Sequence, residues 1–126
     1  MDMQLSHLET PVSDLASLRD QLREFARERD WDQFHSPKNL ASALAVEAAE
    51  LLEPFQWLTE QQSQALSPSQ AEAVRKELAD VLIYLVRLAD KLDVDLVQAA
   101  REKLAENAAK YPVEKAKGSS RKYTDL

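Results

Sequence analysis

Two acidic residues, Glu47 and Glu50, interrupt a segment that otherwise has an apolar helical pattern. They are the only charged residues in residues 40–52, "LASALAVEAAELL", so they do not form the polar face of an ordinary amphipathic helix. A helix this apolar is expected to be buried. An unpaired carboxylate is costly to bury, and the cost is relieved by a proton, by a basic partner or by a metal ion. These two residues are therefore candidates for chemistry.

A second pair, Glu77 and Asp80, repeats the same i, i+3 spacing in "KELADVLIYLV". At this spacing two side chains leave one face of a helix about one turn apart. If the two segments pack side by side, four acids meet. Two carboxylates about 5.5 Å apart repel each other by roughly 3 kcal/mol at an effective dielectric near 20. Such a cluster needs cations or protons.

The ligand atoms of these four acids are all oxygen, which suits Mg²⁺, with Mn²⁺ as a possible substitute. Di-iron helical bundles usually carry Glu-x-x-His pairs, and that pattern is absent here. The alternative is that each acid pairs with a lysine or arginine from another helix or another subunit. Two matched pairs in two apolar helices favour the metal site.

Composition limits the classes of protein that can carry these acids. The chain has 126 residues, which indicates one domain, and it has no cysteine, which excludes a disulfide framework or a thiolate metal site. A net charge of −6 argues against duplex nucleic acid as a partner. Neither a membrane span nor a signal peptide is recognisable, so we expect a soluble, cytoplasmic protein with no membrane partner.

The positioning elements are predicted to be helices, because the chain has a single glycine and its turn residues are helix caps. Thr10-Pro11, Ser36-Pro37 and Ser67-Pro68 each place a capping hydroxyl before a proline, and Asp93 is a fourth candidate cap. The predicted helices are 12–29, 37–58 with a break at Pro54, 68–92 and 94–110. The fold class is all-α, a four-helix bundle in residues 1–112, followed by a polar basic tail, 113–126, that is expected to be mobile.

The order of these stretches resembles the MazG-like superfamily of all-α nucleoside triphosphate pyrophosphohydrolases. Glu47-x-x-Glu50 and Glu77-x-x-Asp80 match its metal-binding signature. The flanking "ERDWDQFHSPKNL", "FQW", "ELADVLIYLVRLA", "KYP" and "SSRKYTDL" resemble its dCTP pyrophosphatase branch. The resemblance implies Mg²⁺-dependent hydrolysis of a nucleoside triphosphate to the monophosphate and pyrophosphate. It assigns the four acids as metal ligands and catalytic residues.

The resemblance also suggests nucleotide contacts, each with a plainer alternative. Trp31 and Trp57 would belong to the base pocket, or else they seal the core. His35 and Asn39, in the segment entering the second helix, could hydrogen-bond the base or sugar. Lys38 could meet a phosphate or could simply be exposed.

Further candidates lie on the third and fourth helices and in the tail. Tyr84 follows Asp80 by one turn on the same face, so it should face the same cleft. The fourth helix and the tail contribute Lys103, Asn107, Tyr111, Arg121 and Lys122. The alternatives for these residues are a solvated helix face and a disordered basic tail. Pro54 could either direct Trp57 into the pocket or displace it from the position that the resemblance gives.

Apolar residues surround most of the circumference of the second and third helices, more than one small bundle buries. We therefore expect a homo-oligomer, and the resemblance makes it a homotetramer built as a dimer of dimers. The leading functional prediction is a dCTP-type pyrophosphohydrolase that removes selected or modified deoxynucleotides. The alternatives are a broad house-cleaning pyrophosphatase for non-standard nucleotides, a helical interaction module with a basic partner, and a non-catalytic nucleotide sensor.

Overall fold

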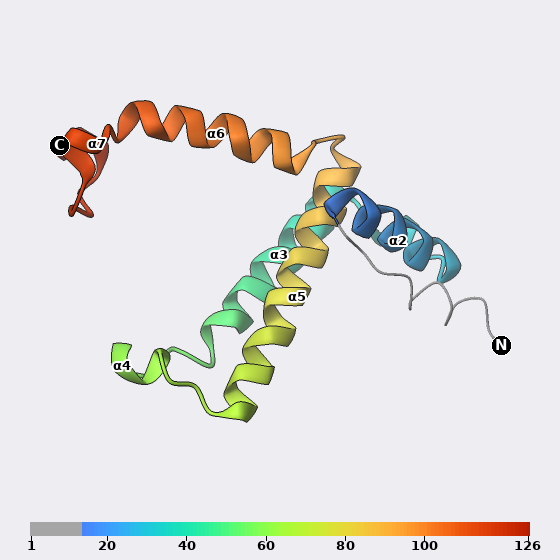
Figure 1. Cartoon of the computed structure of the whole chain (residues 1–126). Coiled ribbons are helices and arrows are strands. Elements are labelled where there is room, and N and C mark those ends of the chain that lie inside the picture. The colour runs from blue at the N-terminus through green and yellow to red at the C-terminus, as the bar shows by residue number, and fades with distance from the viewer. Residues whose placement is uncertain (1–13) are drawn as a thin grey trace. The chain divides into compact units, whose positions relative to one another are not determined.

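A computed structural model describes residues 14–126, and every regular element in this range is helical, which confirms the all-α class (Figure 1). The chain divides into two compact units, one ending at Asp93 and the other spanning Val94–Leu126. The elements of the first unit are α2 (Leu15–Glu28), η1 (Asp32–Phe34), α3 (Pro37–Leu52), α4 (Glu60–Ser63) and α5 (Pro68–Lys91). Those of the second are α6 (Leu96–Lys110), α7 (Val113–Ala116) and η2 (Tyr123–Asp125).

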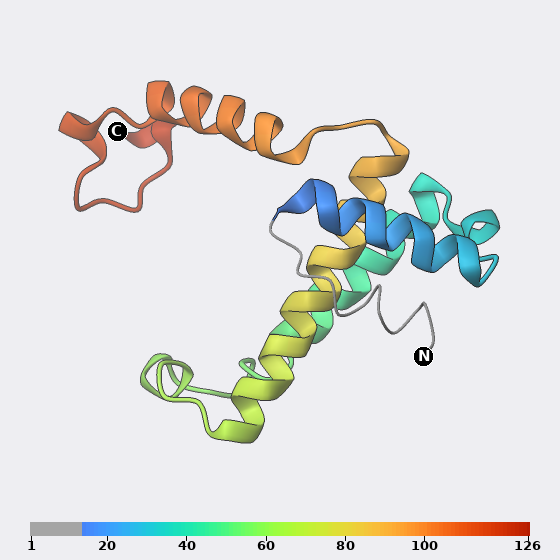
Figure 2. The same cartoon turned by 45° about the vertical axis from the view of Figure 1, so that its right-hand side comes forward.

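The centre of the first unit is the helix pair α3 and α5. The two helices run antiparallel and side by side in both views (Figures 1 and 2), and α2 packs against the C-terminal part of α5. This arrangement matters for function because α3 carries the first acidic pair and α5 carries the second. Side-by-side packing is the condition under which the four acids were expected to meet.

The starts of α3 and α5 are set by the predicted serine caps. The Ser36 hydroxyl accepts a hydrogen bond from the Asn39 backbone N–H, and Ser67 forms a complete capping box with Gln70. The expected Thr10-Pro11 cap lies outside the described residues. Within them, α2 begins after Asp14, whose carboxylate accepts from the Ser17 N–H at 2.8 Å.

The predicted break at Pro54 is confirmed, because α3 ends at Leu52 and residues 53–58 form turns. Pro54 has no N–H, and its ring opposes continuation of the helix. A short helix that was not expected, α4, follows, and Thr59 and Gln62 form its capping box. The same box spacing is visible in the sequence, but only one turn of helix follows it.

In the second unit, one predicted cap is wrong. Asp95, rather than Asp93, caps α6 by accepting from the Gln98 N–H at 3.1 Å. Asp93 has a φ of 55° and belongs to the turn that ends the first unit. The tail that was expected to be mobile contains the two short helical elements α7 and η2.

The buried core of the first unit is small. Its buried apolar residues within the described range are Ala26, Leu40, Val86 and Ala89, and Arg87 is buried with them. Large apolar side chains on the central helices stay open, with Leu78 53% exposed. None of the described helices combines the length and apolar character needed to cross a membrane.

Candidate metal and nucleotide site

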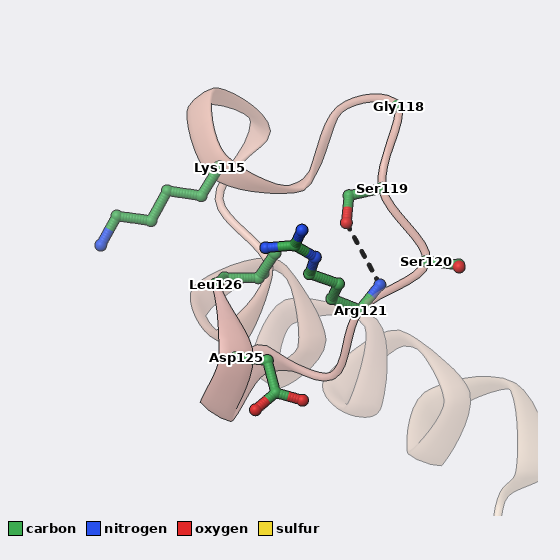
Figure 3. Close-up of a pocket in the computed structure, with 7 residues that line it drawn as sticks. All are labelled: Lys115, Gly118, Ser119, Ser120, Arg121, Asp125 and Leu126. Atoms are coloured by element: carbon green, nitrogen blue, oxygen red, sulfur yellow. Dashed lines mark hydrogen bonds between the residues drawn. The ribbon is translucent and has the colours of Figure 1, made fainter.

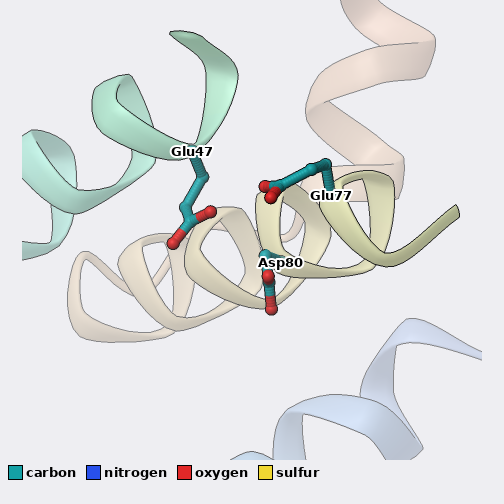
Figure 4. A group of neighbouring side chains, drawn as sticks. All are labelled: Glu47, Glu77 and Asp80. Atoms are coloured by element: carbon teal, nitrogen blue, oxygen red, sulfur yellow. The ribbon is translucent and has the colours of Figure 1, made fainter. Parts of the chain in front are cut away.

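Three of the four predicted acids meet between the central helices. One carboxylate oxygen each from Glu47, Glu77 and Asp80 lies within 4.8 Å of the other two. Figure 4 shows Glu47 reaching from α3 toward Glu77 and Asp80, which leave one face of α5. The i, i+3 spacing on α5 and the antiparallel packing of α3 against it produce this convergence.

Two oxygens in this cluster have no hydrogen-bond partner in the described structure. They are Glu47 Oε2 and Glu77 Oε2, and both are buried. A buried polar atom without a partner costs about 1–3 kcal/mol, and more when it is charged. An ion held between the helices would satisfy both oxygens.

The charge state of Glu47 responds to this crowding. The pKa of Glu47 is raised from its ordinary value of 4.5 to about 7, chiefly by burial and also by the neighbouring carboxyl groups of Glu50 and Glu77. Without a cation, the cluster reduces its repulsion by holding a proton at neutral pH. A divalent cation would replace that proton.

The fourth acid, Glu50, lies one turn after Glu47 on α3 and is partly buried. Its charge acts on Glu47, but it does not belong to the group of three whose oxygens converge. Its role as a fourth ligand stays a prediction. Because the converging donors are carboxylates without histidine or cysteine, they fit a hard divalent cation.

Of the residues predicted to contact the nucleoside, Trp31 and His35 precede α3 and Asn39 lies in its first turn. Trp31 is 46% exposed and packs edge-on against Phe25, with 5.8 Å between the ring centroids. His35 is partly buried, and its Nδ1 faces the Arg87 guanidinium at 3.1 Å. Asn39 donates its side-chain amide to the Phe34 carbonyl at 3.0 Å, so at least one of its polar groups supports the η1 turn.

The contacts of Arg87 were not predicted from the sequence. Its guanidinium contacts Asp32 at 3.0 Å and Asp90 at 3.5 Å, besides His35. The sequence does single out Arg87 as a residue that needs a partner, because it is the only charged residue between Asp80 and Asp90 in an apolar helix. Its partner residues Asp32 and His35, more than 50 positions away, were not recognisable from this isolated charge.

The other three candidates of the first unit differ in how far they are exposed to solvent. Lys38 is exposed in the first turn of α3, and Tyr84 is partly buried one turn beyond Asp80. Trp57, in the turn after Pro54, is 86% exposed. The alternative that Trp57 seals the core of this chain is therefore wrong.

The remaining candidates belong to the second unit. Lys103 pairs with Glu106 at 3.2 Å on α6, and the Tyr111 ring packs edge-on against Tyr123. Asn107 is partly buried, and its carbonyl accepts from the Tyr111 N–H.

Arg121 lines an open hollow of about 630 Å³ in the tail, together with Lys115, Gly118, Ser119, Ser120, Asp125 and Leu126 (Figure 3). Its backbone N–H donates to Ser119 Oγ at 3.2 Å. Lys122, next in the chain, is exposed and precedes η2.

Comparison with known proteins decides the family. Residues 43–126, which include both acidic pairs, match the MazG-like family. The chain belongs to the MazG-like family. The region that matches the family contains the acidic cluster, and the all-helical fold is the one that the resemblance led us to expect.

Individual relatives agree with the MazG-like assignment. The chain is 50% identical to mouse (Mus musculus) dCTP pyrophosphatase 1 over 119 residues, which cover 93% of this chain and 70% of the relative. It is 48% identical to the Homo sapiens protein of the same name, with the same coverage. A solved pyrophosphatase structure from Archaeoglobus fulgidus has a TM-score of 0.75 and 38% identity, and the match covers 82% of this chain and 97% of that one.

Proposed function

We propose that this MazG-like protein hydrolyses dCTP, or a modified deoxycytidine triphosphate, to the monophosphate and pyrophosphate, and so removes such nucleotides from the pool. Relatives near 50% identity over most of the chain are named dCTP pyrophosphatase 1. The observation that carries the proposal in the structure is the convergence of Glu47, Glu77 and Asp80 with two unpartnered buried oxygens. A triphosphate has the same requirement, since its own negative charge must also be neutralised by a cation.

We further propose that the cation is Mg²⁺, with Mn²⁺ as a substitute, and that Glu47, Glu50, Glu77 and Asp80 hold it. The all-carboxylate donor set and the unpartnered oxygens fit such an ion. Bound there, Mg²⁺ would neutralise the phosphates and help to align them for attack. The four acids would bind the ion and so orient the phosphates, and one of their carboxylates would accept the proton of the attacking water.

The nucleotide contacts stay proposals of the same kind. Trp31 is half-exposed before the start of α3 and Trp57 is exposed beyond its end, which leaves indole surface free to stack on a pyrimidine. Because the acidic pair lies between these two ends, the two indoles would serve base sites of different subunits. His35 and Asn39 would contact the nucleoside, and Lys38 and Tyr84 would contact the phosphates or sugar. Lys103, Asn107, Tyr111, Arg121 and Lys122 are further proposed nucleotide contacts, as the family resemblance implies, with their basic groups meeting phosphate.

We also propose that the active form is a homotetramer, a dimer of dimers. The open apolar side chains of α3 and α5 support this, because a small monomer seldom leaves such a surface in water. The helices that carry the acids would then also form the subunit contacts.

The test is product analysis with labelled water. The protein is incubated with Mg²⁺ and dCTP in H₂¹⁸O, the products are separated by chromatography, and their masses are measured by mass spectrometry. Attack at the α-phosphorus yields dCMP that carries one ¹⁸O, with unlabelled pyrophosphate. A parallel panel of canonical and modified triphosphates measures base preference. Release of orthophosphate, or no turnover of any triphosphate, would reject the proposed reaction.

A further inference from the structure

The side chain of His35 is held by a group that can only donate hydrogen bonds. Arg87 Nε lies 3.3 Å from His35 Nδ1, and Arg87 Nη2 lies 3.1 Å from the same atom. A guanidinium has five N–H donors and no acceptor. His35 Nδ1 must therefore present its lone pair, and in the neutral imidazole the ring proton is then on Nε2.

Arg87 is itself fixed by its surroundings. It is 4% exposed. Asp32 accepts a hydrogen bond from its guanidinium, and Asp90 forms an ion pair with it. Lys91 also reaches Asp32 at 2.5 Å, and Arg23 holds Asp90 through two hydrogen bonds of 2.5 and 2.7 Å. A guanidinium held by this network has little freedom to turn away from the histidine.

The same surroundings favour the neutral imidazole. Burial lowers the pKa of His35, and the charges of Arg87 and Lys91 lower it further against the opposing charge of Asp32. Nε2 makes no hydrogen bond within residues 14–126, so its proton is available to a ligand.

The position of His35 relates it to the nucleoside end of a bound nucleotide. Glu47 is ten residues after Pro37, which places it about 15 Å along the axis of α3 from the start of the helix. His35 lies just before that start. With the phosphates at the acidic cluster, an extended nucleoside triphosphate along α3 would bring its base or sugar toward His35.

We infer that Arg87 is a positioning residue that fixes His35 in the Nε2–H form, so that Nε2 donates a hydrogen bond to an acceptor atom on the nucleoside of the substrate. The inference rests on the proposed function for its ligand. The Arg87–His35 arrangement does not depend on it, so the two can fail separately.

The main variant is Arg87→Met, which removes every donor and keeps most of the side-chain length. Asp32 retains Lys91 and Asp90 retains Arg23, so neither acid is left without a cation. The matched control is Arg23→Met, which removes a guanidinium from the same network without touching His35. If Arg87→Met does not fold, Arg87→Gln replaces it in each measurement, because an amide offers an acceptor as well as donors and so no longer selects one tautomer of His35.

The first measurement is ¹⁵N NMR of the histidine side chains. The chain has two histidines, so a His35→Leu spectrum assigns His35. We expect a protonated Nε2 and an unprotonated Nδ1 in the wild type and in Arg23→Met, and a tautomer mixture in Arg87→Met. A wild-type ring protonated on Nδ1 would overturn the inference, whatever the enzyme does with dCTP.

The second measurement is steady-state kinetics with dCTP and Mg²⁺. We expect about a tenfold rise in KM for Arg87→Met and for His35→Leu, with a smaller change in kcat. The double variant should be no worse than His35→Leu alone, because both changes remove one hydrogen bond. A stable Arg87→Met protein with wild-type KM would reject the positioning role, and a wild type that does not hydrolyse dCTP would reject the proposed function instead.

Discussion

Glu47 on α3 and Glu77 on α5 approach each other between the central helices, and each buries a carboxylate oxygen that has no hydrogen-bond partner within residues 14–126. An arrangement of this kind destabilises the metal-free protein, because like charges repel and desolvated oxygens stay unpaired. Binding a cation converts the same geometry into a favourable one. Stability and activity should therefore respond in opposite directions to loss of one of these acids.

We predict that Glu77→Gln raises the melting temperature of the metal-free protein and lowers turnover of dCTP at least about a hundredfold. The amide removes one negative charge from the cluster, and it is a poorer ligand for a hard cation. Differential scanning fluorimetry in EDTA and product chromatography with Mg²⁺ measure the two effects.

The control for this prediction is Glu72→Gln on the same helix. Glu72 is exposed and only loosely paired with Arg75 at 3.4 Å, so its loss should change neither quantity appreciably. Near-normal turnover in Glu77→Gln would show that this acid is structural.

A pH dependence follows from the raised pKa of Glu47. A carboxyl group with a pKa of about 7 in the folded state and 4.5 in the unfolded state favours folding fully below pH 4.5. This contribution is lost as the pH rises toward and past 7, since the unfolded chain then binds fewer protons. In EDTA, the melting temperature of the wild type should fall relative to that of Glu47→Gln between pH 5 and 7.5.

Comparison with Glu47→Gln is needed because other groups titrate nearby. The lowered pKa of His35 acts with the opposite sign, since stability is lost as the pH falls below 6.5, and it is common to both proteins. The lowered pKa values of Asp32 and Asp90 act below 3.8, outside the window. A difference between the two melting temperatures that is constant with pH would contradict the prediction, and Mg²⁺ should abolish the wild-type decline.

The features that could be predicted from the sequence are those determined by local residues. The Ser36 and Ser67 caps and the break at Pro54 depend on neighbours within four positions, and the structure has all three. The meeting of Glu47 with Glu77 and Asp80 needed only one further assumption, that the two helices carrying them pack together. The apolar periodicity of the two helices and the isolated acids within them were sufficient to suggest that packing.

The features that could not be predicted depend on distant residues or on the competition between adjacent caps. Arg87 finds its partners Asp32 and His35 across more than 50 positions, and an isolated arginine in an apolar helix does not identify them. Asp93 and Asp95 are both plausible caps, and the choice follows from the turn in which Asp93 adopts a positive φ.

The exposure of Trp57 leads to a third prediction. Because its side chain is 86% exposed, Trp57→Ala should change the melting temperature of the nucleotide-free protein by no more than a few degrees, and it should raise KM for dCTP about tenfold if the indole stacks on the base. Leu104→Ala, at a 67% exposed position, is the control for removing exposed apolar surface. An unchanged KM would remove Trp57 from the nucleotide site.

The last prediction concerns assembly. Leu78, Leu82 and Leu85 on α5 are each more than a third exposed, and Val46 and Leu52 on α3 are more than half exposed. We expect light scattering at micromolar concentration to give four times the 14.3 kDa chain mass, because association removes this surface from water. Leu85→Glu places a charge on that surface and should lower the mass and the turnover together, whereas Val113→Glu, at an exposed position of the tail, should lower neither. A fully active protein of 14.3 kDa would contradict the tetramer, and it would leave the apolar surface of α3 and α5 to be covered by some other partner.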